Sequence, residues 1–355
     1  MQCYDQKMQS AQHQGLAVFS PANFGMVMAT GIVSLAASFL GFARLATGLF
    51  LLNNILYAVL CVLTMARAVR HRQAFWQDMT SHLRGPSFFT FVAGTSVLGS
   101  QYIAMFGLHA AGVTFLAVGV VSWILLTYTV FAAIIIKEDK PSLDQGITGA
   151  WLLAVVAAQS IAVLSTLVAA QWAQPHRLEL NFIALSMWLW GGMLYIWMMS
   201  LIFYRYTFFR LAPGDLAPPY WINMGAMAIS TLAGSLLIEN SVDAPYLQSL
   251  LPFLKGFTIF YWATATWWIP MLLVLGFWRH VYKRFPLRYD PLYWGAVFPL
   301  GMYTACTLRM STAMSFDFMD MIPRLLFPVA LAAWLVTFAG LLRQLRRWKK
   351  TLPMP

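Results

Sequence analysis

The chain has 355 residues, of which 60% are hydrophobic and only 10% are charged, and its formal net charge is +11. Ordinary globular domains contain about 25% charged residues, so this composition excludes a soluble protein built around one apolar core. It indicates a polytopic membrane protein, in which nearly all of the chain is membrane helix and short loop.

The chain begins with a polar stretch, MQCYDQKMQSAQHQG, which has no apolar core and is therefore not a signal peptide. We expect residues 1–15 to form a cytoplasmic tail. Apolar segments of about 20 residues, enough to cross a bilayer core about 30 Å thick, then recur along the chain. They predict an all-α membrane domain over residues 16–345, followed by a basic tail over 346–355. The ten predicted helices cover approximately 16–42, 46–68, 86–107, 111–136, 147–170, 180–204, 218–239, 247–278, 291–312 and 323–345.

The basic residues are distributed unequally over the loops between these segments. Eighteen of the 23 Lys and Arg fall in the two tails and in the loops after even-numbered helices, and four fall on the other side. By the positive-inside rule this bias places both termini in the cytoplasm of a multi-pass protein of the cell (inner) membrane. The positive charge is thus explained by topology, and no nucleic-acid partner is expected.

The odd-numbered segments begin alike, and the even-numbered ones differ from them. Four odd segments begin SPANFGMVMATG, GPSFFTFVAGTS, PPYWINMGAMAI and DPLYWGAVFPLG, and the fifth, GITGAWLLAVVA, is a weaker copy without proline. Five repeats of a helical hairpin, related by quasi-symmetry, are the simplest interpretation. Small residues allow close helix approach in lipid, so we expect the odd helices to form an inner ring and the bulkier even helices an outer one. The converging helix N-termini would then favour anions.

The predicted helices lack the residue patterns that bind metals, cofactors or nucleotides. The histidines fall in loops or at helix ends, the three cysteines have no pairing or metal spacing, and no phosphate-binding loop occurs. We therefore expect no cofactor, no metal and no enzymatic activity. The predicted helices also lack the buried acidic residues that serve proton relays and cation sites, which fits an anion path. A membrane subunit or enzyme without transport activity is the alternative.

The four proline-containing starts of the odd-numbered segments, together with LPFLKGFTIFYWATATWWIP, resemble the tellurite-resistance/dicarboxylate transporter family. The resemblance extends over about residues 16–345. That family contains TehA-like proteins, fungal malate and sulfite transporters, and plant slow anion channels. The resemblance implies a central pore lined by the odd helices, a bilayer-embedded homotrimer, and a small anion as substrate. Malate or another dicarboxylate, sulfite, a tellurite-like oxyanion and an inorganic anion remain open, as do channel and proton-coupled carrier. It also implies that a phenylalanine in the ninth helix plugs the pore, and Phe298 in YWGAVFPL matches that position.

Phe298 is followed by Pro299, which removes a helix hydrogen bond and bends the helix at this point. Aligning the aromatic pairs at the starts of the odd helices places residue 298 level with Met28, Ala93, Val155 and Gly225. Three of these four are small, so Phe298 has space to project into the axis as a gate. The alternative interpretation is a packed phenylalanine beside a harmless kink.

Polar residues on the odd helices are the candidates for the pore lining, because hydroxyl and amide groups can replace part of an anion's hydration shell. The candidates are Thr30, Thr95, Gln159, Asn223, Ser230 and Thr304. Each of them can instead bond one helix to another. Lys255, a cation inside an apolar segment, could attract anions, snorkel to the surface or pair with Glu239.

Overall fold

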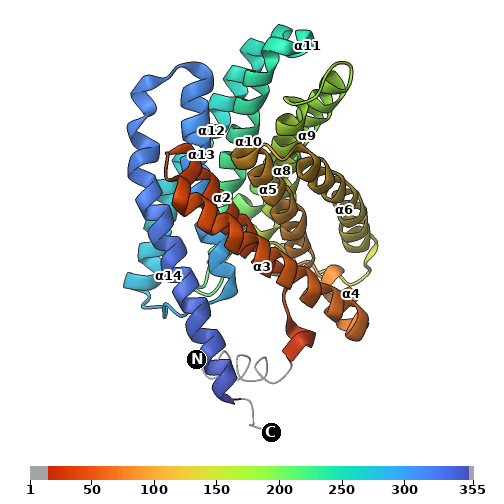
Figure 1. The fold of residues 1–355 in the computed structure, drawn as a ribbon. Helices are drawn as coiled ribbons and strands as arrows, with labels where there is room; N and C mark the ends of the chain where they lie inside the picture. Colours follow the sequence, from red (N-terminus) through yellow and green to blue (C-terminus); the bar gives the residue numbers. More distant parts are fainter. Residues whose placement is uncertain (1–14, 352–355) are drawn as a thin grey trace.

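The computed structural model describes residues 15–351, which form a bundle of long helices joined by short helical turns (Figure 1). The long helices are α2 (Gly25–Phe39), α3 (Ala43–Arg70), α5 (Phe89–Phe106), α6 (His109–Ile136), α8 (Leu153–Ala169), α9 (His176–Phe208), α10 (Ile222–Asn240), α12 (Leu251–Phe277), α13 (Trp294–Met314) and α14 (Met321–Thr351). Among the shorter elements are α4 (Arg72–Met79), α7 (Leu143–Gly146), α11 (Pro245–Ser249) and a π-helical turn, η7 (Trp278–Tyr282). The predicted all-α fold is confirmed.

Within the described residues, nine of these helices are long and apolar enough to cross a membrane. The exception is α13, whose 21 residues are sufficient in length but include Arg309 and several hydroxyl groups. The first described residues and the end of α14 lie at the same end of the bundle (Figure 1). Ten crossings, with α13 as the tenth, remain the prediction, and the placement of the two described ends on one side fits an even number.

The helices are arranged in two concentric layers. Each of α2, α5, α8, α10 and α13 packs against the next, and α13 packs against α2, so these five close a ring. Around it, α3, α6, α9, α12 and α14 each pack on the ring helix that precedes them in its hairpin. In α8 and α10 the membrane-spanning windows are 94% buried, against 22% in α3, α12 and α14. The predicted inner ring of odd helices and outer layer of even helices is confirmed.

Each ring helix is entered through a short 3₁₀ turn. These turns are η2 (Pro21–Phe24), η3 (Gly85–Phe88), η4 (Gly149–Leu152), η5 (Pro218–Trp221) and η8 (Pro291–Tyr293). Proline occupies the first or second position in all of them except η4. At these positions the missing backbone N–H of proline costs nothing, because that group would have no partner within the helix. The turns also contact one another in a closed ring, in the same order as the helices they start.

The turn η4 explains why the third repeat lacks proline. Gly149 begins this turn, and a Cβ atom at Gly149 would lie only 2.6 Å from the carbonyl oxygen of Pro219 in the neighbouring turn. Glycine is required there because the two backbones touch. Thr148 caps the turn by accepting a hydrogen bond from Ala150 N at 3.3 Å, as Ser20 and Asp290 cap η2 and η8.

The structure describes the C-terminal end of the predicted membrane domain, but little of the segment that precedes its N-terminal end. Helix α14 continues to Thr351. The basic segment from residue 346, which was predicted to be a tail, is therefore helical as far as Thr351. The predicted N-terminal tail, residues 1–15, lies almost entirely outside the described residues. Gly15 belongs to the short 3₁₀ turn η1 (Gly15–Val18).

Candidate functional site

A small cavity lies where the five entry turns meet, at the end of the bundle that carries the described termini. Its volume is ≈ 20 Å³, which is space for about one water molecule. All five ring helices or their entry turns contribute to its wall. The lining residues are Ala22, Gly25, Met28, Ser87, Thr90, Ala150, Leu153, Pro219, Ile222, Pro291, Leu292, Trp294, Gly295 and Phe298.

Phe298 and Met28 close the inner end of this cavity. They are the lining residues that lie farthest along their helices from the entry turns. Phe298 is 1% exposed and Met28 is 2% exposed, so both side chains are almost completely buried at this level. The structure therefore brings together the predicted gate residue and one of the four residues predicted to surround it.

The other three predicted neighbours of Phe298 are buried but do not line the cavity. Gly225 faces Pro299, because a Cβ atom at Gly225 would lie 2.7 Å from Pro299 Cγ. The glycine thus provides room for the proline ring. Ala93 and Val155 are fully buried.

The third ring helix is displaced by one residue from the predicted register. Cavity-lining residues recur at intervals of three, as in Ala22 and Gly25 or Pro219 and Ile222. The aromatic alignment would pair Gly149 and Leu152 with these positions, but Ala150 and Leu153 line the cavity. By the same spacing, Val156 and not Val155 is level with Phe298. The missing proline removed the sequence marker that would have set this register.

Three of the predicted pore-lining polar residues bond to the outer layer instead. Thr30 Oγ1 accepts a hydrogen bond from Trp334 Nε1 of α14 at 3.0 Å. Thr95 Oγ1 lies 3.0 Å from the hydroxyl of Tyr57 on α3, and Gln159 Nε2 donates to the carbonyl of Trp188 on α9 at 3.0 Å. These side chains join the ring to its surrounding helices, and the structure does not place them at the cavity.

The remaining polar candidates also lie away from the cavity wall. Ser230 Oγ donates to the carbonyl of Ala226 at 2.8 Å, and Thr304 Oγ1 donates to that of Leu300 at 3.0 Å, each within its own helix. The backbone carbonyl of Asn223 accepts a bond from Tyr195 of α9 at 3.3 Å. All three residues are buried.

Two hydroxyl residues at the cavity were missed by the sequence reasoning. Ser87 and Thr90 line it, and Thr90 Oγ1 donates to the carbonyls of Pro21 and Ser87 at 2.8 and 2.7 Å. In the repeat they correspond to Ala22 and Gly25, so the alignment contained this signal. The polar residues predicted from the sequence to line the pore lie deeper in the helices.

Lys255 lies on the outer layer. It is an exposed residue of α12, and the structure does not bring it to the ring. Glu239, the proposed alternative partner, forms an ion pair with Arg309 of α13. The snorkelling interpretation fits this placement.

The cavity wall carries no charged side chain among the lining residues. Five helix N-termini point at this one small space, and each carries roughly half a positive charge. Such an arrangement attracts anions. The apolar floor formed by Phe298 and Met28 opposes the entry of any ion that keeps its water.

Comparison with known proteins agrees with this geometry. A family model described as "Voltage-dependent anion channel" (SLAC1) matches residues 18–342. A membrane protein of Mycobacterium tuberculosis is 40% identical over 152 residues, covering 43% of this chain and 77% of its own. A transporter of Methanocaldococcus jannaschii is 24% identical, covering 90% of this chain and 91% of its own. The sulfite efflux pump SSU1 of Trichophyton rubrum is 25% identical, covering 90% and 89%.

Proposed function

The chain belongs to the SLAC1 family of voltage-dependent anion channels, and on this basis we propose that it moves small anions along the axis of its inner ring. The observation that carries the proposal is the cavity enclosed by five helix N-termini and floored by Phe298. The positive partial charges of these helix N-termini favour anions. The cavity lies among all five ring helices, as expected for the entrance to a pore.

In the proposed mechanism, the anion first enters the cavity from the cytoplasmic side. Backbone N–H groups and the hydroxyl of Ser87 replace part of its hydration shell, whereas the Thr90 hydroxyl hydrogen is taken by the carbonyls of Pro21 and Ser87. Phe298 and Met28 then form a hydrophobic constriction, which excludes water and ions while the ring of Phe298 fills the axis. Conduction requires that this ring move aside, and Pro299 supplies the irregular backbone beside it.

For the substrate we propose an oxyanion of the size of sulfite, supported by the similarity to a sulfite efflux pump. A dicarboxylate such as malate, a tellurite-like oxyanion and an inorganic anion are the other members of the substrate class. We further propose a homotrimer in the cell membrane, with both termini in the cytoplasm and no enzymatic activity. A membrane subunit without transport is the alternative function.

The test is anion flux with the purified full-length protein in liposomes. In a salt gradient, the reversal potential is expected near the anion equilibrium value, because helix N-termini set the sign of the field. A reversal potential near the cation value would reject the anion pore. A panel of chloride, sulfite and malate under imposed pH gradients separates passive conduction from proton coupling. No flux of any of these anions would favour the subunit alternative.

A further inference from the structure

We propose that Arg309 and Glu239 form a second anion-binding site, at the outer end of the same path, where a permeating oxyanion replaces the Glu239 carboxylate on the Arg309 guanidinium. This inference rests on the proposed anion path. It assigns the residues that recognise the anion on the side away from the cytoplasm.

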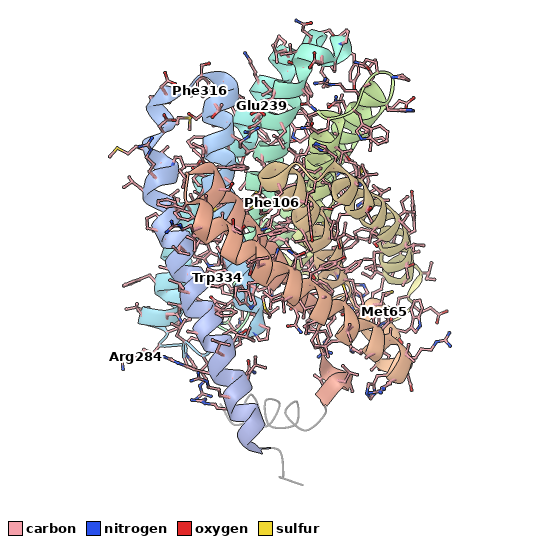
Figure 2. All side chains as sticks on the ribbon, in the orientation of Figure 1. Met65, Phe106, Glu239, Arg284, Phe316 and Trp334 are labelled. Atoms are coloured by element: carbon pink, nitrogen blue, oxygen red, sulfur yellow. The ribbon has the colours of Figure 1, made fainter. Side chains whose placement is uncertain are left out.

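The two residues are unique on the ring. In the five described ring helices α2, α5, α8, α10 and α13, Arg309 is the one basic residue and Glu239 the one acidic residue. The pair joins two neighbouring ring helices, α13 and α10. Glu239 lies near the end of the bundle opposite to Arg284 (Figure 2). The pair is therefore separated from the entry turns by most of the length of the ring helices.

The contacts of Arg309 indicate that its side chain lies on the inner side of the ring. Its guanidinium bonds to Glu239 of α10 on one side, and it lies 5.6 Å from the ring centre of Phe39 of α2 on the other. Both α10 and α2 are ring neighbours of α13, whereas α12 and α14 occupy the outer side of these two junctions. The two contacts therefore point the Arg309 side chain toward its ring neighbours and away from the sides of α13 that α12 and α14 cover.

The helix dipoles of the ring favour a cation at this position. An anion that leaves the helix N-termini moves toward the C-termini, where each helix carries roughly half a negative charge. The outer half of the path would therefore repel the anion that the inner half attracts. Arg309 is the one side chain on the ring helices whose charge can offset this repulsion.

The pair also has hydrogen-bonding capacity that the protein does not use. Arg309 Nε and Glu239 Oε1 are buried and have no hydrogen-bond partner. A guanidinium presents its donors as a planar fork that matches two oxygens of a carboxylate or an oxyanion. In the closed state one carboxylate, Glu239, is bound there. An oxyanion with two acceptor oxygens can take the same donors and engage Nε as well.

The experiment measures sulfite and chloride flux, and sulfite binding by thermal stabilisation, for full-length variants in liposomes and detergent. We expect Arg309→Gln to raise the half-saturating sulfite concentration by about tenfold, because a charged hydrogen-bond donor is lost. Arg309→Lys keeps the charge but loses the fork, so it is expected to weaken sulfite more than chloride. Glu239→Gln removes the competing carboxylate and is expected to lower the half-saturating sulfite concentration.

The matched control is Arg177→Gln. Arg177 of α9 forms an ion pair with Asp243 just after α10, also beyond the outer end of the ring but not on a ring helix. This variant is expected to leave half-saturation and the sulfite-to-chloride ratio unchanged. It removes the same charge and the same kind of ion pair, so it accounts for general effects on stability.

The outcomes separate this inference from the proposed function. Unchanged half-saturation and anion preference in the Arg309 and Glu239 variants, with intact wild-type flux, would overturn the second site alone. The same result with a lowered melting temperature would show that the pair only holds α10 to α13. Absent wild-type flux would overturn the proposed function. In that case, sulfite that raises the melting temperature of the wild type but not of Arg309→Gln still supports the site.

Discussion

Phe298 and Pro299 are neighbours in the chain but have separate tasks in the structure. Phe298 floors the cavity at the entry turns, and Pro299 presses its ring on Gly225 of the adjacent helix. The proline ring thus packs against α10 directly beside the side chain proposed as the gate.

Phe298→Ala is expected to increase anion flux in a folded protein, because Met28 alone is too small to close the axis. Truncating a buried phenylalanine also leaves a cavity, which costs about 3–5 kcal/mol of stability, so melting temperature alone cannot separate gate from packing. Flux in liposomes can. Phe89→Ala is the control, because Phe89 is equally buried but faces Phe131 of the outer layer at 5.9 Å. Flux no higher in Phe298→Ala than in Phe89→Ala would assign Phe298 to packing.

His82 makes the stability depend on pH. Desolvation, and then the positive charges of Lys137 and Lys140, lower the pKa of His82 below its ordinary value of 6.5. In the unfolded chain the imidazole binds its proton at the ordinary value, so the unfolded state takes up more protons as the pH falls below 6.5. Stability is therefore full above pH 6.5 and decreases as the pH falls toward the lowered pKa.

The measurement for His82 is the melting temperature between pH 7.5 and pH 5.5. The decrease is expected to be smaller in His82→Gln than in the wild type, since glutamine cannot be protonated. Equal slopes in the two proteins would show that other groups carry the acid sensitivity.

At the scale of the helices, each hairpin joins a small-residue ring helix to a bulky outer one. Polar side chains hold these layers together, as Thr30 does with Trp334 and Gln159 with Trp188. A hydrogen bond between membrane helices contributes about 0.6 kcal/mol on average. The close approach of the ring helices to one another therefore depends more on glycine and alanine than on these bonds.

The contact between α10 and α13 gives a test at this scale. In Gly225→Ala the new methyl group would lie 2.7 Å from Pro299 Cγ, so the helices must move apart, at a cost of about 1–3 kcal/mol. We expect a lower melting temperature. We also expect a higher basal flux, because Pro299 directly follows Phe298 and a shift of Pro299 would displace the proposed gate. Gly256→Ala on the exposed side of α12, with nothing within 4 Å, is the control and should change neither. Unaltered flux in a destabilised Gly225→Ala protein would uncouple the proline from the gate.

At the scale of the whole molecule, one end of the bundle gathers the basic loops, both described ends and the five helix N-termini. The prediction is that this end faces the cytoplasm. A membrane-impermeant maleimide added outside intact cells is expected to label Phe318→Cys, an exposed position between α13 and α14. Leu287→Cys, exposed between α12 and α13, should be labelled only after the membrane is permeabilised. The opposite pattern would reverse the topology.

The two layers could be predicted from the sequence because they follow from local composition. Proline at a helix start, and small residues within the helix, each have a meaning that requires no knowledge of neighbours. The same reasoning singled out Phe298, which lines the cavity at the entry turns. It did not locate the register of α8, because that repeat starts with Gly149 in place of proline, and the reason for the glycine is a backbone contact with Pro219.

The directions of the polar side chains followed from packing, not from the order of residues. Helices such as α8 and α10 are buried on nearly all sides, so they have no polar stripe to indicate which face meets the axis. Thr30, Thr95 and Gln159 could therefore face either the path or the outer layer, and only their partners on α14, α3 and α9 settle the question. For the same reason the pairing of Arg309 with Glu239 could not be foreseen. Hydrophobicity and helix-start signals are properties of short segments, whereas a side chain's direction depends on which helices surround it.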